Sequence, residues 1–270
     1  MPELPEVEIT RRGIAPFVEG QAVTGVVVRE RRLRWPVPSD LSRKLTGRVV
    51  QRVLRRGKYL LLDFGNGWLI VHLGMSGSLR VIDARTEPRA HEHLDILFEN
   101  IAVRLRDPRR FGAVLWTSAD IARHRLIAGL GIEPLSPEFT GAWLHCATRK
   151  RRTSVKLLLM NARMVVGVGN IYANESLFRA GIAPRTPAAR LSLARCTRLC
   201  QAVRDTLNAA ITAGGSSLRD FVHSDGNSGW FQQQYHAYGR AGLPCRVCGT
   251  LIRSARFGQR TTFWCPACQR

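Results

Sequence analysis

Lysine and acidic residues are both scarce in this chain of 270 residues. Four of its 41 basic residues are lysine, which leaves 37 arginines (41 − 4), and only 20 residues are acidic, so the formal net charge is +21. A GC-rich genome also raises arginine content, but biased codons alone rarely leave acidic residues outnumbered two to one. So large an excess of cations requires a polyanionic partner, and nucleic acid is the most abundant polyanion of a cell.

Long apolar runs are missing as well. No run approaches the ~18 residues of a membrane-spanning helix, which argues against a membrane protein. The charged start excludes a signal peptide, and neither internal repeats nor low-complexity tracts are present. We therefore expect a soluble protein of the cytoplasm. The charged residues among the first twenty are Glu3, Glu6, Glu8, Arg11, Arg12 and Glu19.

Cysteine is rare except at the C-terminal end, where Cys245-x2-Cys248 and Cys265-x2-Cys268 are separated by 16 residues. This spacing is typical of a four-cysteine zinc site, whose thiolates leave no open position for catalysis. A segment of about 30 residues cannot bury a core of its own, so one structural zinc ion would supply its folding energy. Two unrelated CxxC pairs or a redox dithiol are the alternatives. The three other cysteines, expected to be ordinary thiols, are Cys146, Cys196 and Cys200.

Short β-branched and aromatic runs fill residues 22–116, which predicts eight strands in a sandwich or barrel. Gly65-Asn66-Gly67 between two of them is typical of a hairpin turn. Before the strands, residues 2–17 favour a helix, with Pro5 in its first turn, an apolar side of Val7, Ile9, Ile14 and Phe17, and an end near Gly13 or Gly20. The predicted strands are Val23–Val28, Val49–Leu54, Tyr59–Phe64, Trp68–Leu73, Leu79–Ile82, Leu94–Phe98, Ala102–Leu105 and Ala113–Trp116.

After Trp116 the pattern becomes helical. Gly129, Gly131, Pro134 and Pro137 indicate a hinge between domains, and residues 239–270 form a short tail in which 251–253 and 261–264 would pair as a hairpin. The predicted helices are Asp120–Leu130, Pro137–Ala147, Val155–Met160, Ile171–Ala180, Ser192–Ala213 and Ser216–Val222.

Three loops carry residues suited to nucleic acid. Asp107-Pro108-Arg109-Arg110-Phe111-Gly112 places an aromatic ring beside two guanidiniums, which suits a wedge inserted into a base stack. His72-Leu73-Gly74-Met75 ends a strand in a similar way. Residues 161–172 run through a glycine turn to Asn170, which we place at the N-cap of the next helix, where backbone N–H groups can bind phosphate. Taken alone, each is better explained as a structural turn or a solvated loop.

Two features allow amine chemistry, although taken alone they are better explained as an ordinary chain start and a solvated surface lysine. Removal of Met1 would give Pro2 a free secondary amine with a pKa of about 8, which can attack an aldehyde-like sugar carbon and form an iminium. Glu3 beside it can donate or accept a proton. Lys58 stands out because lysine is scarce here and an amine, unlike a guanidinium, can shuttle protons.

Together these pieces resemble bacterial formamidopyrimidine-DNA glycosylase. The resemblance rests on residues 2–8 (Pro-Glu-Leu-Pro-Glu-Val-Glu), 72–77, 107–112 and 166–173 and on the four cysteines, and it covers the whole chain. It implies a bifunctional repair enzyme for 8-oxoguanine and formamidopyrimidines in duplex DNA, acting as a monomer at the bacterial nucleoid. The implied fold is α+β and multidomain: an N-terminal antiparallel β-sandwich with flanking helices (1–133), a helix-two-turns-helix domain (134–238) and a zinc finger (239–270).

The resemblance also implies a role for each matching residue. Pro2 would be the nucleophile at the deoxyribose C1′ and Glu3 the proton donor. Lys58 would assist β-elimination, and Arg260, on the finger, would bind phosphate and act in δ-elimination. Met75, Arg109 and Phe111 would fill the gap left by the flipped nucleotide, with Arg109 facing the orphaned cytosine. The remaining DNA contacts implied are His72, His91, Arg110, Arg151, Lys156 and Asn170.

Two other functions stay open at this point. A sister glycosylase for oxidised pyrimidines shares Pro2-Glu3, the helix-two-turns-helix and the finger, but usually lacks residues 4–8 in this form and the Arg-Arg-Phe wedge. A zinc-finger protein that binds damaged DNA without cutting it is the second. Residues 217–229, which the family uses to cover the damaged base, match the family least well. Arg151 is a second departure, because lysine is common at that position in the family.

Overall fold

The computed structural model describes residues 1–216 and 231–270, which form two compact units. The first consists of Met1–Ala128 with a segment that begins at Ala213, and the second of Gly129–Thr212 and Phe231–Arg270. The predicted cover over the base at 217–229, and all but the first residue of the predicted helix Ser216–Val222, lie outside the described residues.

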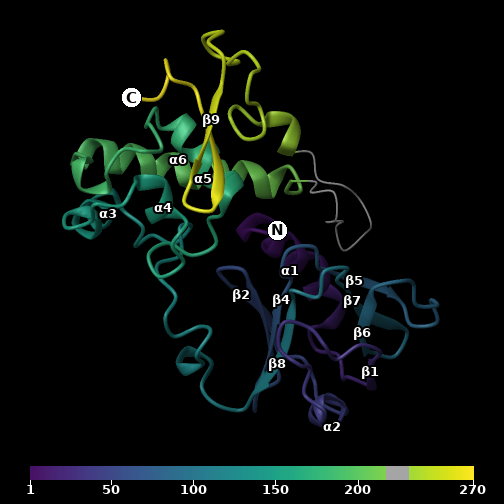
Figure 1. The fold of residues 1–270 in the computed structure, drawn as a ribbon. Coiled ribbons are helices and arrows are strands. Elements are labelled where there is room, and N and C mark those ends of the chain that lie inside the picture. The colour runs from purple at the N-terminus through teal and green to yellow at the C-terminus, as the bar shows by residue number, and fades with distance from the viewer. Residues whose placement is uncertain (217–230) are drawn as a thin grey trace. The chain divides into compact units, whose positions relative to one another are not determined.

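Two four-stranded antiparallel sheets form the first unit (Figure 1). The predicted sandwich is confirmed, and all eight strands lie within a few residues of their predicted positions. One sheet has the order β1-β6-β7-β5, from Gly25–Val28, Glu92–Leu97, Ile101–Arg106 and Ser78–Asp83. The other has the order β2-β3-β4-β8, from Arg52–Arg56, Tyr59–Asp63, Trp68–His72 and Ala113–Thr117.

Apolar side chains from both sheets meet in one core. Leu60 and Leu69 from the second sheet and Val103 from the first have no exposed surface, and Val7 and Ile14 of helix α1 pack into the same cluster. Each such side chain contributes about 1.5–3 kcal/mol of burial free energy. A five-residue helix, α2 (Leu41–Leu45), covers part of this core and was not predicted.

Helix α1 (Leu4–Val18) begins near its predicted start, with Pro5 in its first turn. It continues through Gly13, and Gly20, with a φ of 79°, follows its end. Phe17 is 53% exposed, so the prediction that it belongs to the apolar side was wrong. Glu8 binds Arg11, Arg12 and Arg55. Burial alone would raise the pKa of Glu8, but hydrogen bonds from Arg11 and Arg12 and the charges of Arg11 and Arg55 outweigh burial and lower the pKa to about 2.

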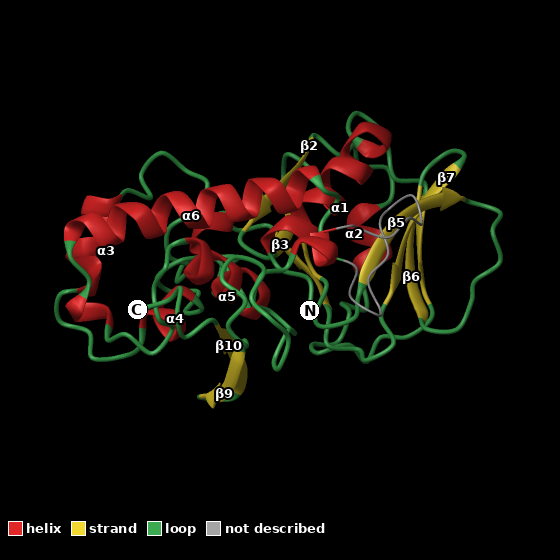
Figure 2. Cartoon of the chain, turned by 90° about the horizontal axis from the view of Figure 1, so that it is seen from above, coloured by secondary structure: helices red, strands yellow, loops and turns green. Residues whose placement is uncertain are grey.

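Helices are the main regular elements of the second unit, and Figure 2 shows the long α6 beside α3 and α5. The helix predicted over Asp120–Leu130, where the first unit ends, is wrong: only Ile121–Arg123 form a 3-10 turn. Ile127 is the one buried residue of 121–130, so a helix there would have no continuous apolar face to pack. The elements of the unit are α3 (Gly141–Thr148), α4 (Val155–Leu159), α5 (Asn170–Arg179), η2 (Ala188–Arg190), α6 (Leu193–Thr212), η3 (Phe231–Gln234), β9 (Arg253–Phe257) and β10 (Arg260–Trp264).

Side-chain caps set where two of these helices start. The Thr140 hydroxyl accepts from Trp143 N–H, so α3 starts at Gly141 rather than at the predicted Pro137. Ser154 caps α4 in the same way through Leu157 N–H.

The helices of residues 1–216 and 231–270 do not include a membrane span. None of them has the length and the apolar character that a bilayer crossing requires.

Candidate functional site

The N-terminal residues are held by one buried carboxylate. Pro2 is buried and Glu3 is 2% exposed. Glu6, which has no exposed surface, accepts from Glu3 N–H at 2.8 Å through Oε2 and from Ser216 N–H at 2.9 Å through Oε1. The first turn of α1 and the backbone at residue 216 are therefore fixed to the same side chain. Sequence reasoning treated Glu6 only as a charge at a helix start, although the Glu3-x-x-Glu6 spacing of a capping box was a signal for this role.

Lys58 and His72 lie at neighbouring ends of the β2–β3–β4 sheet. Gly57 and Lys58 form the two-residue turn between β2 and β3, and Gly57 adopts a φ of 56°, which suits glycine. Tyr59 is paired with His72 across β3 and β4, and their rings are 4.9 Å apart.

The imidazole of His72 is neutral and its tautomer is fixed. Its Nδ1 accepts from Gly74 N–H at 3.0 Å, so the proton is on Nε2. Burial, and after it the positive charges of Lys58 and Arg34, lower the pKa of His72 to about 4. His72 thus offers a neutral N–H donor beside the ammonium of Lys58, which suits hydrogen bonding to an anionic oxygen without a proton being transferred.

The three predicted wedge residues come together from two loops. Met75 lies half-buried in the β4–β5 turn, while Arg109 and Phe111 are exposed in the β7–β8 loop, with the Arg109 guanidinium 4.9 Å from the Phe111 ring centre. The two loops touch: a Cβ built on Gly74 would lie 2.4 Å from the Phe111 carbonyl carbon. Phe111 remains 44% exposed, so its ring is available to contact a partner.

Two of the predicted DNA contacts beside the wedge have strained backbones. His91 and Arg110 are exposed and have φ values of 69° and 56°, which side chains other than glycine rarely adopt. Arg110 also forms a 3.3 Å ion pair with Glu30. Each such residue costs on the order of 1 kcal/mol, and strain of this kind concentrates at functional sites.

In the second unit, the turn before α5 lies against strand β10. Asn170 is the first residue of α5 rather than its N-cap, because Gly169 occupies the cap position. Its side-chain amide donates to the Thr261 carbonyl at 3.0 Å, directly after Arg260, which is exposed at the start of β10. The structure therefore brings Asn170 close to Arg260. The Arg151 side chain is exposed and bonds to the carbonyl of Ala147.

Lys156 does not match the DNA contact that we predicted. Its side chain has no exposed surface, and its ammonium donates to Thr262 Oγ1 at 2.7 Å and to the Thr261 carbonyl at 3.2 Å. Buried in this way, the ammonium ties α4 to β10 and does not face solvent, where a phosphate would bind. We therefore revise its role to a support for the strand that carries Arg260.

The four C-terminal cysteines form one cluster. All four Sγ atoms lie within 4.8 Å of one another, and three of the S–S distances are 3.4, 3.5 and 3.9 Å. A tetrahedral zinc with Zn–S bonds of about 2.3 Å places its sulfurs about 3.8 Å apart, so the cluster fits this ion. The finger is anchored within its own unit, since Phe263 N–H donates to Asn174 and the Gln269 side chain donates to the Ile182 carbonyl.

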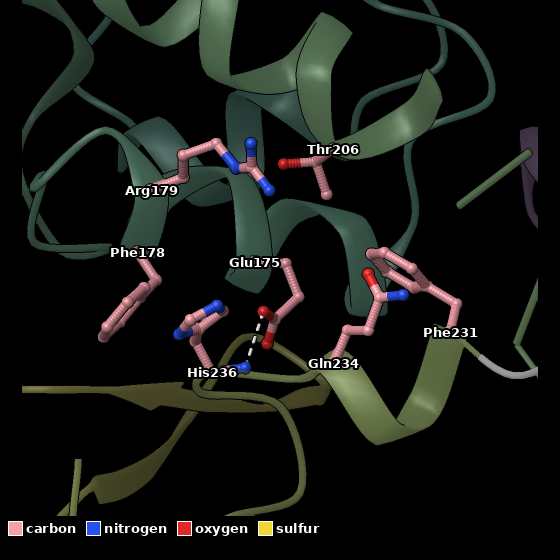
Figure 3. Close-up of a pocket in the computed structure, with 7 residues that line it drawn as sticks. All are labelled: Glu175, Phe178, Arg179, Thr206, Phe231, Gln234 and His236. Carbon is pink, nitrogen blue, oxygen red and sulfur yellow. Dashed lines mark hydrogen bonds between the residues drawn. The ribbon is translucent and has the colours of Figure 1, made fainter. Parts of the chain in front are cut away.

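A cavity of about 210 Å³ lies beside the segment that enters the finger. Figure 3 shows the Glu175 carboxylate directed at the backbone of His236, whose ring stacks on Phe178 at 5.0 Å. Glu175 is 4% exposed and accepts three backbone N–H groups, from His236, Ala237 and Tyr238, at 2.7–2.9 Å. Its negative charge thus fixes the chain on which the finger is built, a role that the sequence did not reveal.

Comparison with known proteins decides the family. The model of the formamidopyrimidine-DNA glycosylase N-terminal domain matches residues 1–114, that of the H2TH domain of the same glycosylase matches 130–222, and a zinc finger found in FPG and IleRS matches 242–270. The chain is 60% identical to the formamidopyrimidine-DNA glycosylase of Burkholderia vietnamiensis, over the full length of both. It belongs to the formamidopyrimidine-DNA glycosylase family.

Solved structures agree with this assignment. The MutM (Fpg) protein of Thermus thermophilus is 38% identical, with a TM-score of 0.89 over 99% of this chain and 98% of that one. Fpg of Lactococcus lactis, solved with DNA that contains an abasic site, is 31% identical, with a TM-score of 0.91 over 99% of both chains.

The match to the finger model contains all four clustered cysteines, so the prediction of one structural zinc ion is confirmed.

Proposed function

We propose that this chain is a DNA glycosylase and abasic-site lyase that removes oxidised purines, 8-oxoguanine and formamidopyrimidines, from duplex DNA. It would act as a monomer at the nucleoid of a bacterium. The observation that carries the proposal is the Pro2-Glu3 start, fixed by the buried Glu6 in a chain of this family. The net charge of +21 supports a DNA substrate, because binding to phosphates releases counterions.

Pro2 is the proposed nucleophile, after removal of Met1. An acylated proline nitrogen has no free lone pair, so the form with Met1 would be an inactive precursor. The free amine attacks C1′ of the damaged nucleotide, the bond from C1′ to the base breaks, and Glu3 supplies the proton for this step. The C1′–O4′ bond of the sugar then breaks, and the proton of the proline ammonium passes to O4′. The ring-opened iminium that results makes the C2′ proton acidic. Loss of that proton expels the 3′ phosphate by β-elimination, and δ-elimination then expels the 5′ phosphate.

The other site residues would hold the DNA while this occurs. Lys58 and the neutral His72 offer two donors for a phosphate beside the reacting sugar, and Lys58 also assists β-elimination. Arg260, supported by β10, would bind a phosphate and assist δ-elimination, with Asn170, Arg151, Arg110 and His91 as further DNA contacts. Met75, Arg109 and Phe111 would occupy the gap in the stack, which offsets the few kcal/mol needed to flip a base.

One assay tests this proposal. Protein without Met1 is incubated with duplexes that carry 8-oxoguanine, an oxidised pyrimidine or a preformed abasic site, and borohydride is added during turnover. We expect cleavage of the 8-oxoguanine and abasic duplexes and a stable protein–DNA adduct that maps to the first peptide. Glu3→Gln should lose base excision but keep reaction with the abasic duplex, which already exposes an aldehyde.

Other outcomes would point elsewhere. Cleavage restricted to the pyrimidine lesion would indicate the sister activity, and retention without cleavage a damage-binding protein. An adduct at Lys58 or Lys156, or full activity with Met1 retained, would move the nucleophile to a lysine.

A further inference from the structure

The turn that carries Met75 and the loop that carries Phe111 are joined by a buried carboxylate. Asp107 has no exposed surface. Its Oδ1 accepts from Ser76 Oγ at 2.9 Å, and its Oδ2 accepts from Gly112 N–H at 2.7 Å. The backbone carbonyl of Asp107 lies 2.9 Å from His93 Nε2 and also accepts from Arg110 N–H at 3.1 Å. One residue thus binds both ends of its own loop and the neighbouring turn.

Ser76 extends this link to the wedge itself. The serine is 1% exposed, and its hydroxyl donates to Asp107 while it accepts from Arg109 N–H at 3.2 Å. Hydrogen bonds therefore run without interruption from Gly112 through Asp107 and Ser76 to Arg109. The loops are also in contact through their backbones, since a side chain on Gly74 would collide with the Phe111–Gly112 peptide.

We propose that Asp107 and Ser76 are positioning residues that hold Met75, Arg109 and Phe111 in their inserting arrangement before DNA binds. This inference rests on the proposed function, in which these three side chains enter the base stack. Ordering a loop during binding reduces affinity, whereas a loop already ordered by buried, charge-assisted hydrogen bonds avoids that loss. Neither positioning residue touches DNA; each acts through the wedge.

The chain provides a matched control for Ser76. Ser78 lies two residues further on, at the start of β5, and has no exposed surface either. In the described part of the chain, its hydroxyl oxygen has no hydrogen-bond partner. Ser78→Ala therefore removes the same atom from the same strand end without affecting Asp107.

The experiment compares Ser76→Ala, Ser78→Ala and the parent protein under single-turnover conditions. Each is given a duplex with 8-oxoguanine opposite cytosine, and the same duplex with a preformed abasic site. We expect Ser76→Ala to lower the excision rate at 8-oxoguanine about tenfold, the low end of the range for loss of a hydrogen bond to a charged group, with abasic cleavage changed less than twofold. Ser78→Ala should match the parent on both substrates.

The ratio of the two rates separates positioning from folding. Partial misfolding of Ser76→Ala lowers both rates equally, and borohydride trapping on abasic DNA counts the active molecules in each preparation. A 2-aminopurine beside the lesion reports unstacking, and its fluorescence rise should be slower in Ser76→Ala only. Asp107→Asn, which keeps the shape of the side chain, should shift the ratio in the same direction.

Two results are decisive against the inference. An unchanged ratio in Ser76→Ala, or the same change in Ser78→Ala, would overturn the positioning role. A parent protein that cleaves neither duplex would instead refute the proposed function.

Discussion

Replacing Lys156 by methionine distinguishes a structural role from a DNA contact. Methionine keeps the length and apolar stem of the side chain but has no ammonium. The change removes the hydrogen bonds to Thr262 Oγ1 (2.7 Å) and the Thr261 carbonyl (3.2 Å), from a side chain with no exposed surface. Hydrogen bonds from a charged group contribute about 1.5–3 kcal/mol each, and removal of the buried charge offsets part of the loss.

We expect Lys156→Met to lower the free energy of unfolding of the second unit by about 2–4 kcal/mol. The measurement is thermal unfolding followed together with zinc release, detected with a colorimetric chelator, because β10 runs directly into Cys265. Lys150→Met is the control, since Lys150 is exposed near the end of α3. Thr262→Val, alone and combined with Lys156→Met, completes a double-mutant cycle that isolates the coupling between the two side chains.

A different outcome of Lys156→Met would indicate a DNA contact. If Lys156 contacts DNA, Lys156→Met will leave unfolding and zinc release unchanged and will reduce the salt dependence of duplex binding by about one unit of slope. That outcome would refute the revised role and restore the original prediction.

Three further predictions concern the metal, the phosphates and pH. Cys248→Ser should release zinc and abolish stable duplex binding, and active protein in which metal analysis finds no zinc would contradict the structural role of the ion. Arg260→Ala should weaken binding to all duplexes and lower the salt slope by roughly one, as measured by fluorescence anisotropy at several salt concentrations, and a slope near zero in the parent would contradict the electrostatic basis. The pKa of His72 is lowered from 6.5 to about 4, so the unfolded chain binds more protons between these values and stability must fall as pH drops from 6.5 to 4. Urea unfolding across that pH range should show a smaller loss of unfolding free energy in His72→Gln, whose side chain cannot titrate. An identical loss in the two proteins would show that the pKa of His72 is not lowered.

The strands were predictable because their signal is local. Short β-branched runs bounded by glycine and charged residues identified all eight strands, and Gly65-Asn66-Gly67 marked the turn between β3 and β4. The failures have local causes too. Helix α2 is a single turn, too short to show periodicity, and of the apolar residues in 120–130 only Ile127 is buried.

The functional residues also divide into those with a local sequence signal and those without one. The exposed ones, such as Arg109 and Phe111, lie in short motifs that can be identified in the sequence. Their buried supports depend on partners far along the chain: Ser76 and Asp107 are 31 residues apart, Glu175 and His236 61, and Lys156 and Thr262 106. No local spacing encodes such pairs. Lys156 was assigned to DNA through the family resemblance, and its burial against Thr262 became visible only in the structure.

Burial of acidic residues explains how so basic a chain keeps a defined site. Acidic side chains are rarely buried unless they are paired, yet within residues 1–216 and 231–270 seven are buried: Glu3, Glu6, Glu8, Asp63, Asp95, Asp107 and Glu175. Three of them, Glu6, Asp107 and Glu175, bind backbone N–H groups at the helix start, the wedge loop and the finger base. An exposed carboxylate at any of these places would repel phosphate, whereas a buried one contributes strong hydrogen bonds and leaves the surface to the arginines. Replacing Glu6 and Glu175 by glutamine and Asp107 by asparagine should therefore change the geometry of the site strongly. The same changes should alter the long-range attraction between protein and DNA far less.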